Sequence, residues 1–222
     1  MGSAIGATLG YAIGIAISPI PIASVILMLF SGRARSNSVA FLVAWIAGIA
    51  TVTTVVLLIP GLGADGGEPS DTTGWIKLGL GVLLLLAGIR QWSSRPGGDE
   101  EPSVPGWMER IDSLGPGAAF GLGFLLSALN PKNLLLAAAA GASIAALELS
   151  GGEAAVSVIV FTVIAALTVA VPVIGYLIAG NRLDHSLDAA KAWLIGNNAA
   201  VMAVLFVVFG ASLIGDGIQI LT

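Results

Sequence analysis

The chain has 222 residues, of which 56% are hydrophobic and 10% are charged, with a mean hydropathy of +0.97 and a net charge of −4. This composition excludes an ordinary soluble globular protein and predicts an integral membrane protein. The chain contains no cysteine, which excludes thiol relays, disulfides and thiolate metal sites.

Six stretches meet or approach the roughly 20 apolar residues that a membrane-spanning helix needs. They lie near residues 4–30, 38–59, 74–91, 117–147, 154–179 and 193–220. The first and the fourth are long and each contains a proline break, which predicts tilted or discontinuous helices. Since little sequence remains outside these stretches, we expect an all-α integral membrane protein with six transmembrane helices in a single membrane domain over residues 1–222.

The positive charges predict the orientation of these spans. Seven of the nine Lys and Arg residues follow the first, third or fifth span, one lies within the fourth span (Lys132) and one lies on the opposite side (Lys77). The seven are Arg33, Arg35, Arg90, Arg95, Arg110, Arg182 and Lys191. Cytoplasmic loops carry the excess of Lys and Arg, so both termini are predicted outside, an N-out/C-out topology.

Three spans in each half is an odd number, so the second half must enter the membrane from the opposite side. We therefore expect a 3+3 inverted-topology repeat, with the first three-helix repeat over 1–91 and the second over 117–222. The offset between Pro19 and Pro131 is also that between Pro60 and Pro172. Residues 92–116 are predicted to form a cytoplasmic linker, whose apolar face at Trp107, Met108, Ile111 and Leu114 suits an interfacial helix.

Two proline motifs lie about halfway along the first and fourth spans, Ser-Pro-Ile-Pro at 18–21 and Asn-Pro-Lys-Asn at 130–133. Ser and Asn are favoured N-cap residues and proline suits the first helical position, so each motif is predicted to start a second half-helix. Two such N-termini meeting near the midplane would favour an anion, and Lys132 would add a full charge. The predicted substrate-binding residues are Ser18, Pro19, Pro21, Asn130, Pro131, Lys132 and Asn133.

Each of these features also has a structural interpretation. Prolines often only kink membrane helices, Asn often only bonds between helices, and Lys132 would snorkel to an interface if its span began later. Small-residue faces, such as that of Gly81 and Gly88, suit packing within the protomer, with a homodimer interface as the weaker alternative. No carboxylate lies at the depth of Lys132, so neither a metal site nor a catalytic residue is predicted. We expect no enzyme, no cofactor and no nucleic-acid partner.

Ser-Pro-Ile-Pro resembles the proline motif in the first helix of the LysE (lysine exporter) superfamily, and Leu-Asn-Pro-Lys at 129–132 resembles its Asn-Pro-Lys signature. The closer similarity is to the GAP/Sap family within it, the glycopeptidolipid- and sulfolipid-addressing proteins. The segments that carry it are 16–32, 107–108 with 111–112, and 121–141. Amino-acid exporters of the superfamily have Pro-Gly-Pro, whereas Ile20 stands at the middle position here.

This resemblance implies a multi-pass protein of the bacterial plasma (inner) membrane that exports a cell-envelope lipid or other anionic amphiphile. The chain has no nucleotide-binding loop, so a transporter would be driven by an ion gradient, by a substrate gradient or by a partner, and we expect a secondary transporter driven by an ion gradient. The implied partners are membrane lipids and a larger lipid-export machine. Two alternatives stay open, a small-molecule (amino-acid-like) exporter and a non-transporting membrane adaptor for a lipid-export complex.

Overall fold

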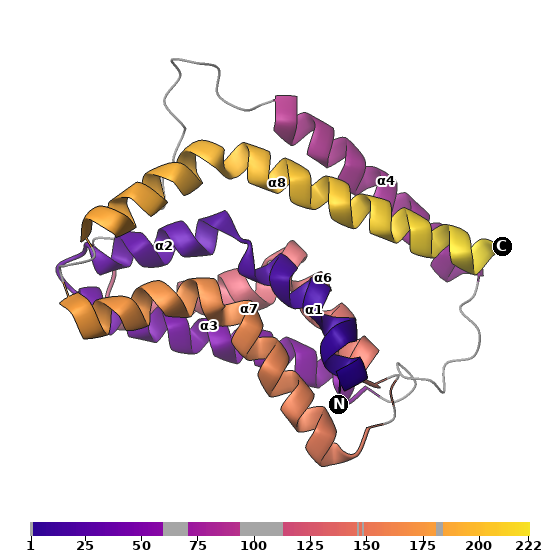
Figure 1. Cartoon of the computed structure of the whole chain (residues 1–222), viewed down its shortest axis with the longest axis horizontal. Helices are drawn as coiled ribbons and strands as arrows, with labels where there is room; N and C mark the ends of the chain where they lie inside the picture. The colour runs from indigo at the N-terminus through magenta and orange to yellow at the C-terminus, as the bar shows by residue number, and fades with distance from the viewer. Residues whose placement is uncertain (1, 60–70, 94–112, 146, 148, 181–183) are drawn as a thin grey trace. The chain divides into compact units, whose positions relative to one another are not determined.

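The computed structural model describes residues 2–59, 71–93, 113–145, 147, 149–180 and 184–222, and within these ranges it contains helices and no strand (Figure 1). The all-α class is therefore confirmed. The helices are α1 (Gly2–Ala16), α2 (Pro19–Leu29), α3 (Ala34–Leu57), α4 (Asp71–Ser93), α5 (Pro116–Phe124), the π-helix η2 (Leu125–Leu129), α6 (Pro131–Ala145), α7 (Gly151–Ala179) and α8 (Asp184–Leu221). Nearly all of the linker 92–116 and its expected interfacial helix lie outside the described residues.

Proline breaks two of the predicted spans. The pair α1 and α2 is bent by 54° around Ser18-Pro19, as Figure 1 shows, and the segment Pro116–Leu129 is bent by 61° from α6 at Asn130-Pro131. The helices α3 and α7 and the part of α8 from Ala199 to Gln219 are long and apolar enough to cross a membrane. Counting each bent pair as one span gives up to five among the described residues. The expected span 74–91 falls on α4, which is helical but is not one of these five.

The chain forms two compact units. Unit 1 comprises Met1–Asp65 and Val104–Ala192, and unit 2 comprises Gly66–Ser103 and Trp193–Thr222. Unit 1 thus contains both broken helix pairs together with α3 and α7, whereas unit 2 contains α4 and most of α8. Each unit therefore draws corresponding helices from both of the expected halves of the chain.

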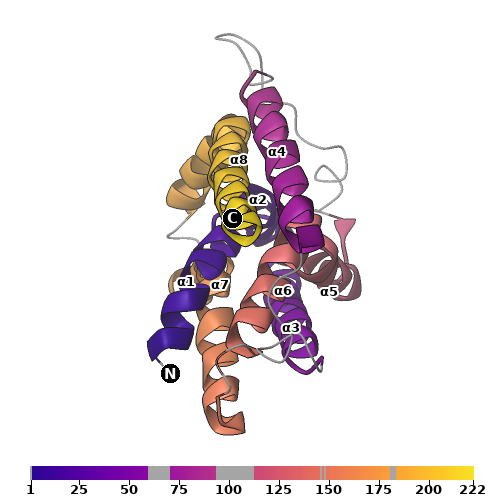
Figure 2. The same ribbon diagram turned by 90° about the vertical axis from the view of Figure 1, so that its right-hand side faces the viewer.

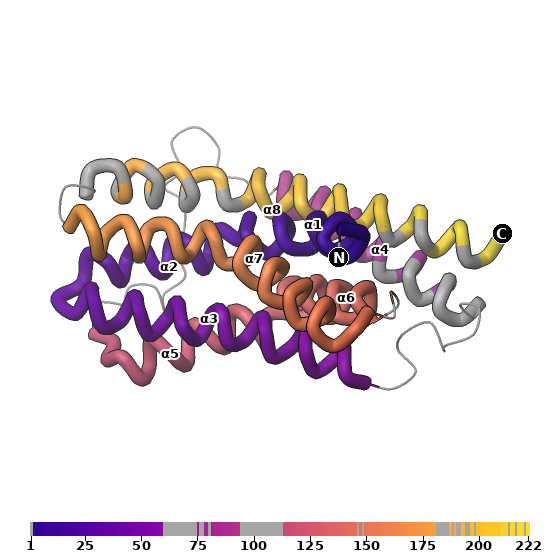
Figure 3. Tube along the Cα trace, turned by 60° about the horizontal axis from the view of Figure 1, so that its bottom comes forward, coloured from indigo at the N-terminus to yellow at the C-terminus, as the bar shows by residue number. Residues whose placement is uncertain are grey.

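Within unit 1, α3 is the helix against which α5, η2 and α6 pack in turn, as the tube in Figure 3 shows. Glycines permit this close approach, since small residues let membrane helices pack backbone to backbone. A Cβ added to Gly123 would lie 2.6 Å from the Phe41 carbonyl oxygen, and one added to Gly141 would lie 2.5 Å from the Thr53 carbonyl oxygen. Phe41 and Trp45 stack in the core of this unit with ring centroids 6.2 Å apart.

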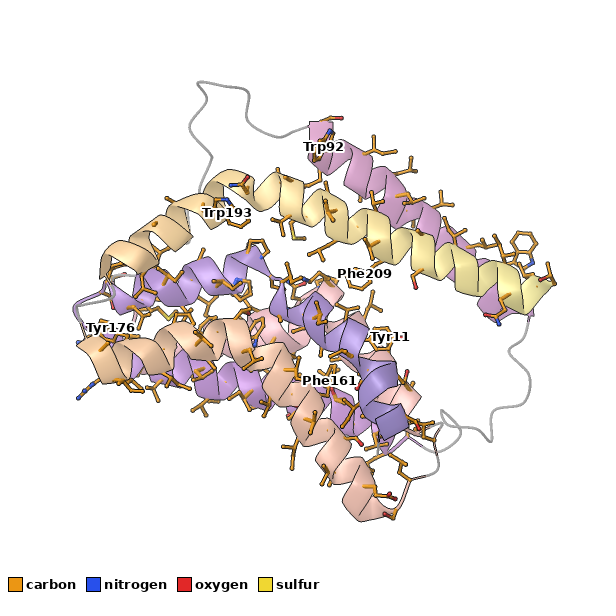
Figure 4. The ribbon with its side chains drawn as sticks, in the orientation of Figure 1. Tyr11, Trp92, Phe161, Tyr176, Trp193 and Phe209 are labelled. Carbon is orange, nitrogen blue, oxygen red and sulfur yellow. The ribbon has the colours of Figure 1, made fainter. Side chains whose placement is uncertain are left out.

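The helix α1 packs against α6 and α7, and α2 packs against α3 and α7. Figure 4 labels Tyr11 of α1 and Phe161 of α7, and Phe161 is fully buried in this unit. The opposite face of α7 is apolar and exposed along the whole helix, at Ile159, Val163, Val171 and Ile178. An exposed apolar face of this length is what contact with lipid requires, so the packing agrees with a membrane protein.

Unit 2 is a close pair of helices, α4 beside α8, as Figure 2 shows. Two glycines face each other across the pair, because a Cβ on Gly81 would lie 2.8 Å from the Gly210 carbonyl oxygen, and a Cβ on Gly210 would lie 2.9 Å from that of Gly81. A Cβ on Gly88 would lie 3.2 Å from the Ala203 carbonyl oxygen. The predicted small-residue face of Gly81 and Gly88 therefore packs within the protomer.

Candidate functional site

The two proline motifs are in contact with each other, although 115 residues separate Ser18 from Asn133. Ser18 lies between α1 and α2 with extended backbone angles (φ −115°, ψ 103°), and Asn130 lies between η2 and α6 with φ −66° and ψ 121°. The Ser18 hydroxyl donates to Asn133 Oδ1 at 3.4 Å. Both side chains are buried. The point where the two helix breaks meet, which we call the junction, lies inside unit 1.

Lys132 reaches across the junction to the end of α1. Its Nζ donates to Ser18 Oγ at 2.7 Å, to the Gly14 carbonyl oxygen at 2.9 Å and to the Ile17 carbonyl oxygen at 3.4 Å. The last carbonyls of a helix have no partner within the helix and carry its partial negative charge, so they attract a cation. An ammonium has three N–H groups. All three are used, by carbonyl oxygens at the end of α1 and just after it and by the Ser18 hydroxyl.

The two asparagines satisfy the backbone on their own side of the junction. Asn130 Oδ1 accepts the Lys132 backbone N–H at 3.1 Å, which is the N-cap bond that the sequence predicts for α6. Asn133 Nδ2 donates to the Leu126 carbonyl oxygen at 2.8 Å, within the π-helix η2. Ser18 precedes α2 as expected but makes no side-chain cap, because its hydroxyl is engaged by Lys132 and Asn133.

The prolines limit how many backbone donors the helix starts present. Pro19 and Pro21 have no N–H, and the Ile22 N–H is bonded to the Ser18 carbonyl, so the first turn of α2 retains only the N–H of Ile20. In α6, Pro131 has no N–H either, while the Lys132 N–H is capped by Asn130 and the Leu134 N–H is bonded within the helix. Each N-terminus therefore contributes a single backbone donor, and most of the positive charge at the junction belongs to Lys132.

A third helix reaches the junction that the sequence analysis did not place there. Thr168 of α7 donates its hydroxyl to the Ala16 carbonyl oxygen at 2.6 Å. Four residues later Pro172 lies inside α7 and cannot donate to the Thr168 carbonyl, and Figure 1 shows that α7 bends along its length. The sequence feature that could have pointed to α7 is a threonine one turn before a proline within an apolar stretch. No feature of the sequence marks the carbonyls of Gly14 and Ile17 as partners of Lys132.

Lys132 is the only charged residue of α1, α2, α5, η2 and α6. The neighbouring helices add Arg35 near the start of α3 and Glu153 in the first turn of α7, where Glu153 completes a capping box with Ser150. The described residues contain no group of three or more His, Asp or Glu side chains that could hold a metal ion. The chemistry of the junction is therefore that of one ammonium held by neutral oxygen atoms.

No curated protein and no solved structure matches the chain. The family described as Sap, sulfolipid-1-addressing protein, matches residues 8–219, which include both helix breaks, Lys132 and Thr168. Since the match covers nearly the whole sequence, the chain belongs to the sulfolipid-1-addressing protein (Sap) family.

Proposed function

We propose that this protein is a membrane transporter that exports an anionic cell-envelope lipid or a similar amphiphile, and that it binds the anionic group at the junction. It is a multi-pass membrane protein of a lipid-addressing family. The observation that carries the proposal is the ammonium of Lys132, which lies where two broken helices meet and is held by hydrogen bonds to neutral groups. Substrate sites of transporters lie typically between such discontinuous helices.

The way Lys132 is held suggests how binding is converted into movement. A sulfate, phosphate or carboxylate group competes for the ammonium with full charge, whereas its present partners are two carbonyls and a hydroxyl. An anion bound by Lys132, Ser18, Asn130 and Asn133 would therefore draw the ammonium away from α1. That exchange breaks the link between α6 and the α1–α2 break, so substrate binding would change the contact between the two broken helices.

The order of helices supports a 3+3 inverted repeat with six spans. In each half a bent pair is followed by a long apolar helix (α3 or α7) and then by a helix of unit 2 (α4 or α8). On α4, Trp75 and Trp92 are exposed. Their spacing along the helix is about 26 Å at 1.5 Å per residue, near the thickness of a bilayer core, and tryptophan is typical of both interfaces. We infer that α4 is the sixth span.

The lipid composition of envelope fractions tests the export function. In cells that lack the protein, we expect one class of anionic lipid to accumulate in the plasma membrane and to be depleted from the outer envelope. Re-expression of the wild-type chain should restore the distribution. An unchanged distribution of every anionic lipid class would count against lipid export.

A topology prediction follows from the positive charges. Alkaline phosphatase, which is active only outside the cytoplasm, should be active when fused after Thr222 and inactive when fused after Gly97 in the expected cytoplasmic linker. The N-out/C-out orientation in the bacterial inner membrane predicts this pair of results. An active Gly97 fusion together with an inactive Thr222 fusion would show the opposite orientation.

One observation favours the second candidate function, a non-transporting adaptor for a lipid-export complex. Ser18 is only 5% exposed and Asn133 is 0% exposed, so in this conformation this side of the junction is packed, although Lys132 is half-buried and Pro131 is exposed. Purified protein in liposomes separates the two candidates. A transporter should move a fluorescent anionic lipid between leaflets when an ion gradient is imposed, whereas an adaptor should leave the lipid where it is. The amino-acid-like exporter is tested in the same vesicles with a labelled amino acid.

A further inference from the structure

We propose that the oxygen atoms that hold Lys132 form a binding site for a monovalent cation, which the protein fills with its own ammonium in this conformation. The site consists of the carbonyl oxygens of Gly14 and Ile17 and of Ser18 Oγ. A free cation would take the place of the ammonium once Lys132 turns to the anionic substrate. The inference rests on the proposed function only for that last step.

The ligand set is the first reason. Three oxygen atoms surround one nitrogen at 2.7, 2.9 and 3.4 Å, and two of them are backbone carbonyls at the end of the 15-residue helix α1. In transporters, carbonyls of half-helix C-terminal ends and of unwound segments coordinate the coupling ion. All three oxygen atoms are neutral. A divalent ion such as Ca²⁺ is held by carboxylates in addition, so a neutral set favours a single positive charge.

The second reason is the cost of leaving these carbonyls without a partner. Water is scarce at membrane depth, and each unsatisfied backbone group there costs several kcal/mol. The neighbouring Ala16 carbonyl is already bonded to the Thr168 hydroxyl. When Lys132 leaves, the carbonyls of Gly14 and Ile17 at the negative end of α1 therefore need another donor or a cation.

No other charged side chain on the helices around α6 replaces the Lys132 ammonium at these carbonyls. The titratable or charged side chains on the helices packed against α6 are Tyr11 on α1, Arg35 on α3, and Glu153 and Tyr176 on α7. None of them donates a hydrogen bond to the Gly14 or Ile17 carbonyl among the bonds of the described residues. A cation from solution is then the partner, and by linkage it and the anionic substrate favour each other's binding.

Thermal unfolding of the purified Lys132→Ala variant tests the site, because this variant lacks the tethered ammonium. Its melting temperature is measured in N-methylglucamine chloride and in equal concentrations of sodium, potassium or methylammonium chloride. We expect at least one of the three small cations to raise the Tm saturably, by about 5 °C or more at about 100 times its Kd. The wild type should show no such rise, since Lys132 fills the site.

The double variant Lys132→Ala, Ser18→Ala is the control for the ligand set, and it should bind the cation at least about tenfold more weakly, because one of three ligands is gone. A chain without cysteine offers a second control. In Lys132→Cys, alkylation with 2-bromoethylamine rebuilds an ammonium and should remove the cation effect, whereas alkylation with iodoethane should leave it.

The absence of a saturable effect of sodium, potassium and methylammonium on Lys132→Ala would overturn the cation site. Should that variant be recovered only as aggregate, Lys132→Met, which keeps an unbranched side chain, is measured in its place with the same expectations. The readout involves no lipid. A cation effect without lipid movement in liposomes would therefore reject the proposed function and keep the site, while the reverse result would reject the site alone.

Discussion

Replacing Lys132 with methionine is expected to abolish lipid movement while leaving a folded protein in the membrane. In the proposed mechanism the ammonium exchanges its three hydrogen bonds across the junction for bonds to the substrate anion, and methionine can make neither set. A hydrogen bond to a charged group contributes about 1.5–3 kcal/mol, so losing even one in a rate-determining step slows it by about 10- to 150-fold. The measurement is the rate at which a fluorescent anionic lipid changes leaflet in liposomes that contain the purified variant.

Two controls make this result specific. Lys77→Met removes a positive charge from α4, which belongs to unit 2, and should leave transport near the wild-type rate. Lys132→Arg keeps the charge, but the planar guanidinium does not fit an ammonium site, so we expect partial activity. Wild-type transport by Lys132→Met would show that the substrate does not use the junction.

The positions of the helix breaks could be predicted because their causes are local. Proline removes a donor and disfavours the helical conformation of the residue before it, and Ser18 and Asn130 are in addition favoured N-cap residues, so both motifs predict a break. The structure has both residues in extended backbone. The N-cap of α6 is also determined locally, and the Asn130 side chain forms it by accepting the Lys132 N–H.

The partners of Lys132 could not be predicted, because every residue has a carbonyl and nothing in the side chains marks Gly14 or Ile17. The lack of a carboxylate at this depth made Lys132 look like a free positive charge. Its partner is the negative end of α1, which exists only because Pro19 ends that helix just before the junction. Ser18 illustrates the same limit, since its expected cap was replaced by bonds to residues 114 and 115 positions away.

The π-helix before Asn130 could not be predicted from the local sequence either. The buried Asn133 side chain donates to one carbonyl of η2, that of Leu126, and the buried Ser127 hydroxyl donates to the Phe124 carbonyl at the end of α5. Irregular backbone persists at membrane depth only where the protein supplies such partners. π-helical turns occur frequently at functional sites, which agrees with placing the substrate at the junction.

A lysine held by neutral groups is suited to exchange. A carboxylate partner inside the membrane would form a charge pair that a substrate anion could displace only by burying a second, unpaired negative charge. Two carbonyls and a hydroxyl are neutral, so no unpaired negative charge stays buried when the ammonium moves to an anion. A cation can then take the place of the ammonium as their partner. The same three acceptors therefore stabilise Lys132 at rest and, in the proposed mechanism, link its release to the substrate.

Replacing Gly123 with leucine is expected to destabilise the protein strongly, whereas the same change at Gly121, on the same helix, should not. A Cβ on Gly123 would lie 2.6 Å from the Phe41 carbonyl oxygen and 3.1 Å from Ala44 Cβ, while a Cβ on Gly121 meets no atom within 4 Å. Both variants gain helix propensity, by up to about 1 kcal/mol. Any difference in stability between the two variants therefore reports the contact between α5 and α3.

The obstacle at Gly123 is backbone, which cannot turn away as a side chain can, so we expect the substitution to cost about 3 kcal/mol of stability, the upper end for overpacking. This corresponds to a Tm lower by about 6–12 °C for a chain of this size, measured by far-UV circular dichroism in detergent. Equal Tm values for the two variants would contradict the close packing. Because α5 runs directly into η2 and the Asn130 break, a displaced α5 also moves Asn133 relative to Ser18, so transport by Gly123→Leu should fall even at temperatures where it stays folded.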